Sequence, residues 1–168
     1  FSDVECIPGP INKLALFTSI PVKALYKPVK NKYLDRWICK RRTKYGLKLL
    51  KSGQALKLLL KDEHNSSIII FIADQFPGKD NGFALEFLNQ KTQMFSGAEQ
   101  LARKLNAHVA YAELLPASNH TWHLDIKTIC EQAKNTDTTY ITKSFANMLE
   151  SSIYKNPSLW LWSHKRWK

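Results

Sequence analysis

The chain has 168 residues and a mass of 19.4 kDa, a size at which one packed domain is expected and two full-sized domains are not. With 44% hydrophobic and 23% charged residues it has average globular composition, which excludes disordered and collagen-like chains, and no apolar run reaches the length of a membrane-spanning helix. The formal charge of +11 indicates an acidic partner: nucleic acid, anionic lipid headgroups or an acidic carrier protein.

The positive charge is concentrated in one stretch. Between residues 23 and 61 the sequence has thirteen Lys and Arg residues and one acidic residue, Asp35. A solvated surface without a special partner is the plain alternative to a binding surface. The three cysteines are far apart and form no C-x-x-C pair, so we expect a reducing compartment and neither a disulfide framework nor a metal site.

Periodicity and breaker residues predict helices that alternate with strands. Asn31 caps a helix that ends at Gly46, and Leu34, Trp37, Ile38 and Arg41 share one of its faces. The β-branched run at 67–73 is typical of a strand covered on both faces, so we expect it to be central. The expected fold class is α/β, with a layered, central, mostly parallel sheet flanked by helices. The other expected elements are helices near 11–18, 52–61, 97–105 and 140–154 and strands at 21–26, 107–114 and 121–128.

Asp74 and Gln75 directly follow the run at 67–73, at the carboxyl end of the expected central strand. In open α/β sheets ligands bind outside the carboxyl ends of the strands, which makes both residues site candidates by position. The alternative is an aspartate that merely caps a turn.

Two further patterns have structural interpretations. Ser96 and Glu99 form a capping box, and Ser96 lacks the G-x-S-x-G context of a hydrolase nucleophile. His120 and His123 would point to opposite faces of a strand, so we expect no metal site there. No cofactor is expected.

The composition of the tail at 159–168, L-W-L-W-S-H-K-R-W-K, suits either an RNA-stacking surface or a buried aromatic anchor with a basic rim. We expect residues 160–167 to be packed, because exposed tryptophans would form a large apolar patch, with Lys165, Arg166 and Lys168 on the solvent side. This tail resembles that of the lipid A biosynthesis acyltransferases, the late (lauroyl or myristoyl) enzymes of the lysophospholipid acyltransferase superfamily. Within this family, the sequence is most similar to that of Bacteroidetes members. Three more segments carry the resemblance in the same order: Y-K-P-V-K-N-K at 26–32, A-D-Q at 73–75, and F-L-N-Q-K-T at 87–92 leading into F-S-G at 95–97.

The resemblance implies transfer of a fatty acyl group from acyl carrier protein to a hydroxyl of a lipid A precursor at the cytoplasmic face of the inner membrane. Both partners are anionic, so the net charge of +11 would attract them to the chain. We expect residues 1–168 to be a single, peripheral acyltransferase-like domain, the C-terminal part of a longer protein that has no nucleic-acid partner. The alternatives are a basic nucleic-acid-binding domain and a degenerate domain retained for structure.

The family's catalytic motif is H-x-x-x-x-E/D, in which histidine takes the acceptor's proton and the carboxylate orients the histidine. Glu5 matches the acidic position, and the histidine would stand immediately before Phe1. We therefore expect these 168 residues alone to transfer no acyl group. An ordinary solvated carboxylate is the alternative reading of Glu5.

The resemblance also implies substrate-binding residues. Lys27 stands where many members have arginine, and would supply a cation for a lipid phosphate without the bidentate fork of arginine. Asn31 and Arg36 match the same block, and Asp74 and Gln75 would organise the acceptor pocket. We expect one cleft to hold Glu5, Lys27, Asp74 and Gln75, because a hydroxyl, its base and its phosphate anchor converge on one substrate.

Overall fold

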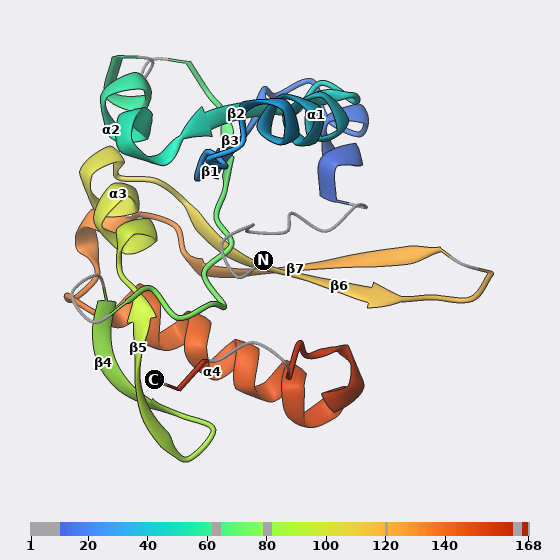
Figure 1. Cartoon of the computed structure of the whole chain (residues 1–168). Coiled ribbons are helices and arrows are strands. Elements are labelled where there is room, and N and C mark those ends of the chain that lie inside the picture. The colour runs from blue at the N-terminus through green and yellow to red at the C-terminus, as the bar shows by residue number, and fades with distance from the viewer. Residues whose placement is uncertain (1–10, 62–64, 79–81, 120, 163–165, 168) are drawn as a thin grey trace. The chain divides into compact units, whose positions relative to one another are not determined.

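The computed structural model describes residues 11–61, 65–78, 82–119, 121–162 and 166–167. Contacts divide the chain into two compact units, Phe1–Ile72 and Ala73–Lys168 (Figure 1). The expectation of one acyltransferase-like domain over 1–168 stays a prediction. None of the helices in the described ranges is both long and apolar enough to cross a bilayer.

The first unit contains a parallel sheet of three strands in the order β2-β1-β3. Val22 and Ala24 of β1 are 1% exposed and form the core together with Leu47. Ile68 and Ile70 of β3 pack against this core and are half-buried. β1 is therefore the central strand and β3 lies at the edge, so the central position expected for 67–73 is wrong. The elements are η1 (Ile11–Leu16), β1 (Val22–Tyr26), α1 (Lys32–Thr43), β2 (Lys48–Lys51), α2 (Ser52–Lys61) and β3 (Ile68–Ile70).

The second unit has two antiparallel strand pairs and two long helices. Leu88 and Asn89, both at positive φ (51° and 59°), make the two-residue turn of the first hairpin, which the sequence patterns did not predict. The described strands thus form a mixed α/β structure rather than one central parallel sheet. The elements are β4 (Gly82–Phe87), β5 (Gln90–Phe95), α3 (Gly97–Leu105), β6 (Val109–Pro116), β7 (Trp122–Cys130), η2 (Ala133–Asn135), α4 (Tyr140–Lys155) and η3 (Pro157–Leu159).

The core of the second unit lies between the β4–β5 hairpin and α4. Phe87 and Met94 are fully buried and pack against Ala146 and Ile153 of the helix. The hairpin is also fastened at its turn, because the Leu88 N–H donates to the Glu150 carboxylate. A hairpin that the sequence patterns did not predict therefore supplies the two fully buried apolar residues of this core.

Glu99 has a different role from the one its spacing suggests. Ser96 precedes α3 but makes no side-chain capping bond, so the capping-box interpretation is wrong. Glu99 is 1% exposed, and its carboxylate accepts hydrogen bonds from the N–H groups of Thr139 (2.6 Å) and Thr142 (2.9 Å) and from the Thr142 hydroxyl (2.6 Å). These donors start α4, so a buried anion satisfies the positive end of that helix.

Candidate functional site

Lys27 is the first residue after the central strand of the parallel sheet, and it is exposed. Its neighbour Tyr26 is 7% exposed; burial, with a hydrogen bond to Cys39, raises the pKa of that hydroxyl to about 12. Two residues further on, the Val29 N–H donates to the Asp35 carboxylate at 2.9 Å. The loop is thus fixed on both sides of Lys27, whose ammonium group remains in solvent as a phosphate ligand requires.

Asn31 is the N-cap of α1, as expected. Its side-chain oxygen accepts the N–H groups of Tyr33 (3.0 Å) and Leu34 (3.1 Å), which accounts for this residue structurally. Arg36, one turn into the helix, is exposed. A role for either residue in substrate binding stays a prediction.

Asp74 and Gln75 belong to the second unit, in irregular backbone four to five residues beyond the end of β3, and both are half-buried. The Asp74 carboxylate acts on two groups of its own unit. Burial lowers the pKa of the Arg166 guanidinium, and the charge of Asp74 opposes that shift. Burial also raises the pKa of the Tyr111 hydroxyl; the hydrogen bond to Ser152 opposes this effect, and Asp74 adds to it. Asp74 therefore lies within electrostatic reach of Arg166 and Tyr111.

Arg166 corrects an expectation about the tail, namely that its cations lie on the solvent side. The residue is 1% exposed. Its Nη1 donates to the Thr92 hydroxyl at 3.1 Å, its Nη2 contacts the Met94 sulfur at 3.2 Å, and its guanidinium carbon lies 5.5 Å from the centroid of the Phe87 ring. The β4–β5 hairpin thus encloses this cation, and no pattern within the tail signals that burial.

The tail tryptophans divide into two groups. Trp160 and Trp167 pack on Phe87, with ring centroids 6.1 and 6.4 Å apart, so the expected aromatic anchor is confirmed for these two. Trp162 is 58% exposed, although its indole N–H donates to the Pro157 carbonyl at 2.7 Å. Lys165 and Lys168 lie outside the described residues.

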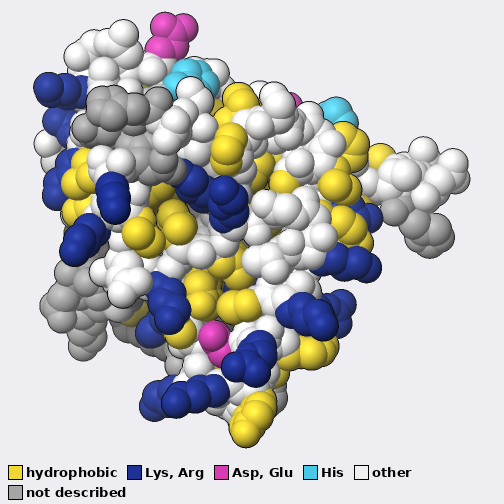
Figure 2. Space-filling model, turned by 90° about the horizontal axis from the view of Figure 1, so that it is seen from above, with side chains coloured by type: hydrophobic (Ala, Val, Ile, Leu, Met, Phe, Trp, Pro, Cys, Tyr) yellow, Lys and Arg dark blue, Asp and Glu magenta, His cyan; other side chains and the backbone are white. Residues whose placement is uncertain are grey.

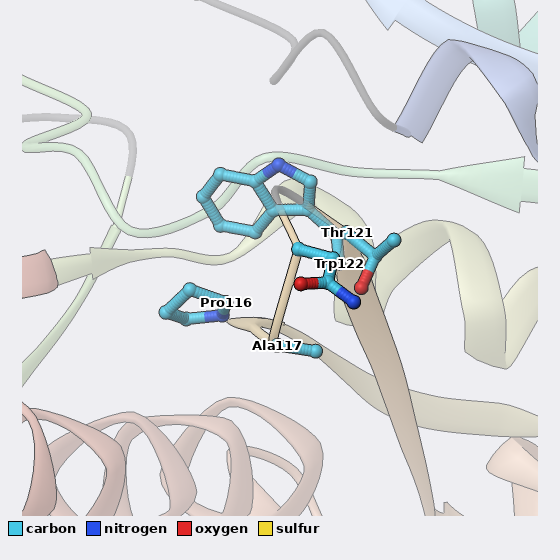
Figure 3. Close-up of a pocket in the computed structure, with 5 residues that line it drawn as sticks. Pro116, Ala117, Thr121 and Trp122 are labelled. Atoms are coloured by element: carbon cyan, nitrogen blue, oxygen red, sulfur yellow. The ribbon is translucent and has the colours of Figure 1, made fainter.

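A surface hollow of about 530 Å³ lies at the turn of the β6–β7 hairpin and contains none of the candidate residues (Figure 3). Its walls are Pro116, Ala117, Asn119, Thr121 and Trp122, which offer no titratable group. The described residues of its wall therefore supply no base for acyl transfer. His120, in the same turn, lies outside the described residues, and His123 of β7 is exposed.

The comparison with protein families decides between the functional classes. Residues 12–168 match the model of the bacterial lipid A biosynthesis acyltransferases. The chain belongs to this family. A search of the curated proteins found no match. Membership implies acyl transfer in lipid A synthesis, and the matched range includes the candidate residues Lys27, Asn31, Arg36, Asp74 and Gln75.

Glu5, the acyltransferase's expected acidic catalytic residue, lies before the matched range and outside the described residues. Its role stays a prediction, as does the single cleft expected to hold Glu5, Lys27, Asp74 and Gln75. Within the matched range the structure adds Arg166, in reach of Asp74, as a residue that spacing did not single out. The candidate residues form two groups: Lys27, Asn31 and Arg36 in the first unit, and Asp74, Gln75 and Arg166 in the second.

Proposed function

We propose that the chain is the acyltransferase domain of an enzyme that moves a fatty acyl group from acyl carrier protein to a hydroxyl of a lipid A precursor, at the cytoplasmic face of the inner membrane. The observation that carries the proposal is the family match over residues 12–168. The charge of +11 supports it, because both the carrier protein and the phosphorylated lipid are anionic. The same proposal assigns the enzyme to the late acyltransferases, which transfer lauroyl or myristoyl groups, and to a Bacteroidetes source.

In the proposed reaction the acceptor hydroxyl oxygen attacks the carbonyl carbon of the carrier's thioester. A histidine encoded immediately before Phe1 takes the hydroxyl proton, and Glu5 orients that histidine. The new ester C–O bond forms as the C–S bond breaks, and the imidazolium returns the proton to the departing thiolate. Each proton is thus accounted for within the acceptor, the dyad and the carrier thiol.

The remaining candidates bind the acceptor in this proposal. Lys27 supplies a cation for a lipid phosphate, and its exposed position next to a fixed loop supports that role. Asp74 and Gln75 orient the acceptor hydroxyl. The buried cation Arg166 is opposite in charge to Asp74 and within its electrostatic reach, which supports a shared role of the two groups.

Kinetics of the complete gene product test these roles. Asp74→Asn should lower kcat roughly tenfold or more, because its side chain keeps its shape and loses its charge. Lys27→Ala should raise KM for the acceptor, and Lys27→Arg should restore it, since arginine also binds phosphate. Asp125→Asn is the matched control, because Asp125 is partly exposed and forms an ion pair with a near neighbour in the chain, Lys127, at 3.0 Å. Equal losses in Asp74→Asn and Asp125→Asn would remove the assigned role.

The structure weakens the nucleic-acid alternative in the tail. That alternative needs aromatic faces and cations open to unpaired bases. Trp160 and Trp167 are instead packed on Phe87, and Arg166 is buried beside them. Binding of the chain to single-stranded RNA in preference to acyl carrier protein and anionic vesicles would restore the alternative and contradict the proposal.

A further inference from the structure

Helix α1 presents its apolar side chains to solvent. Trp37 is 55% exposed, Tyr33 86% and Leu34 40%, and none of the twelve residues of the helix is buried. The opposite side of the helix, at positions 35, 38, 39 and 42, is the half-buried one. A helix at the surface of a globular protein normally turns its apolar stripe to the core. The outward stripe of α1 therefore lacks, within its own unit, the apolar surroundings that such side chains favour.

Cations flank this stripe. Lys40, Arg41 and Lys44 lie on the same side as Trp37 at helical spacing, and all three are exposed. The Arg41 guanidinium carbon is 4.9 Å from the centroid of the Trp37 ring. Asp35, the one acidic residue of α1, lies on the half-buried side. The outer side of the helix thus combines aromatic rings with positive charge alone, and Figure 2 shows a face of the molecule where Lys and Arg side chains likewise surround hydrophobic ones.

A second apolar group lies beside the end of α1. Leu16, at the end of η1, is 60% exposed, and Phe17, next to it, is 82% exposed. The Tyr45 ring joins the two elements, because the Lys13 ammonium of η1 lies 6.0 Å from its centroid and that of Lys44 lies 5.4 Å from it. Exposed apolar side chains therefore occur on two neighbouring elements of one unit, which meet at the Tyr45 ring and its two cations.

This chemistry matches an anionic lipid surface. Helices that lie in a membrane interface place aromatic and aliphatic side chains at the acyl boundary and Lys and Arg near the headgroup phosphates. An acidic carrier protein would complement the cations, but a charged protein surface offers no apolar phase for side chains as exposed as Tyr33 and Phe17. A bilayer with anionic headgroups accommodates both kinds of side chain.

We propose that the outer side of α1, together with Leu16 and Phe17, is the surface that lies on an anionic lipid bilayer, with Trp37 at the boundary between headgroups and acyl chains. The inference rests on the proposed function, which brings the chain to a lipid substrate, and it adds the surface that meets the bilayer.

Flotation of the protein with vesicles tests the location of the charge. Lys40→Glu with Lys44→Glu should weaken binding to mixed phosphatidylglycerol and phosphatidylcholine vesicles by about tenfold or more. Lys48→Glu with Lys57→Glu changes the net charge equally from exposed positions on β2 and α2, and should weaken binding only about twofold. Equal weakening by the two pairs would overturn the proposal, because it would mean that net charge alone drives binding.

Quenching by brominated lipids tests insertion of the aromatic side chains. Trp37→Phe should remove most of the lipid-dependent quenching, whereas Trp162→Phe, at a tryptophan of similar exposure in the other unit, should leave it. Tyr33→Ser with Trp37→Ser should weaken binding even at salt concentrations that screen the cations. If Trp162→Phe removed most of the lipid-dependent quenching and Trp37→Phe left it unchanged, the assignment of the surface to α1 would be overturned.

Two further readouts separate this inference from the proposed function. Binding to acyl carrier protein is measured with the same variants: loss of carrier binding with unchanged vesicle binding would assign this surface to the carrier and refute the inference. Acyl transfer is measured with a detergent-solubilised acceptor, where the variants at positions 33, 37, 40 and 44 should keep wild-type activity. Loss of that soluble activity in these variants would place the outer side of α1 in the catalytic machinery and overturn its role as a docking surface.

Discussion

Replacing the buried Arg166 tests how the second unit holds a cation in its core. Arg166→Ala removes a long side chain that is 1% exposed, and the resulting cavity costs about 2–5 kcal/mol, the range seen for large-to-small core substitutions. Loss of the bond to Thr92 and of the contact with the Phe87 ring adds about 1 kcal/mol each. The variant no longer has to keep a charged guanidinium away from water, and this gain offsets several kcal/mol of the loss. The free energy of unfolding should therefore fall by about 3 kcal/mol in total.

Arg166→Met separates packing from charge. Methionine retains most of the volume and needs no hydrogen bonds, so we expect a change within about 1 kcal/mol of wild type. Thr92→Val should cost about 1–3 kcal/mol in wild type, where it leaves Nη1 without its acceptor, and less than about 0.5 kcal/mol in the Arg166→Met background.

The assay for these variants is denaturant unfolding followed by tryptophan fluorescence, to which Trp160 and Trp167, packed on Phe87, are sensitive. Two results would refute the reasoning. Arg166→Met could prove as destabilising as Arg166→Ala, or Thr92→Val could cost the same in both backgrounds. Either would show that the polar contacts of the guanidinium do not behave as the geometry indicates.

The remaining predictions concern three other residues. Glu99→Gln should lower the free energy of unfolding by about 2–3 kcal/mol, because an amide NH₂ would face the donors at the start of α4. Circular dichroism during denaturation measures this loss, and an unchanged unfolding midpoint would contradict the prediction. Asn31→Ala should cost about 1 kcal/mol, and Asn31→Asp should retain the cap; similar losses in both would contradict the capping role. Tyr26 has a folded pKa of about 12 against an ordinary 10.0, so its contribution to stability is complete below pH 10 and is lost as the pH rises through 12. In Tyr26→Phe this alkaline loss should shrink, and ultraviolet absorbance should show one tyrosine fewer ionising near pH 12; an unchanged titration would refute the assignment.

Local patterns predicted most helices because the signals lie within each segment. Asn31 provides a cap that the structure confirms, and α3 ends where a left-handed Asn106 follows Leu105. The β4–β5 hairpin was missed because its turn, Leu88-Asn89, has neither glycine nor proline. Periodicity also showed that Leu34 and Trp37 share a side of α1, but it could not show that this side faces solvent, because that depends on the rest of the unit.

The candidate site was predictable where position in the chain decides it. Lys27 follows the central strand β1 directly, whereas Asp74 and Gln75 lie four to five residues beyond the edge strand β3 rather than at the end of a central strand. The burial of Arg166 was not predictable, because its partner Thr92 is 74 positions away in the chain and charged residues are normally exposed. The role of Glu99 was missed for the same reason, since its donors lie 40 or more positions further along the chain.

The central claim is acyl transfer from acyl carrier protein to a lipid A precursor. The most direct measurement incubates the complete gene product with acyl carrier protein carrying a fatty acyl group and with the precursor, and follows the mass of the lipid. The account predicts that the lipid gains the mass of one acyl chain, with an equal amount of free carrier thiol, and that Asp74→Asn greatly slows this change. A folded protein that leaves the precursor unchanged, or an Asp74→Asn variant that acylates it at the wild-type rate, would contradict the account.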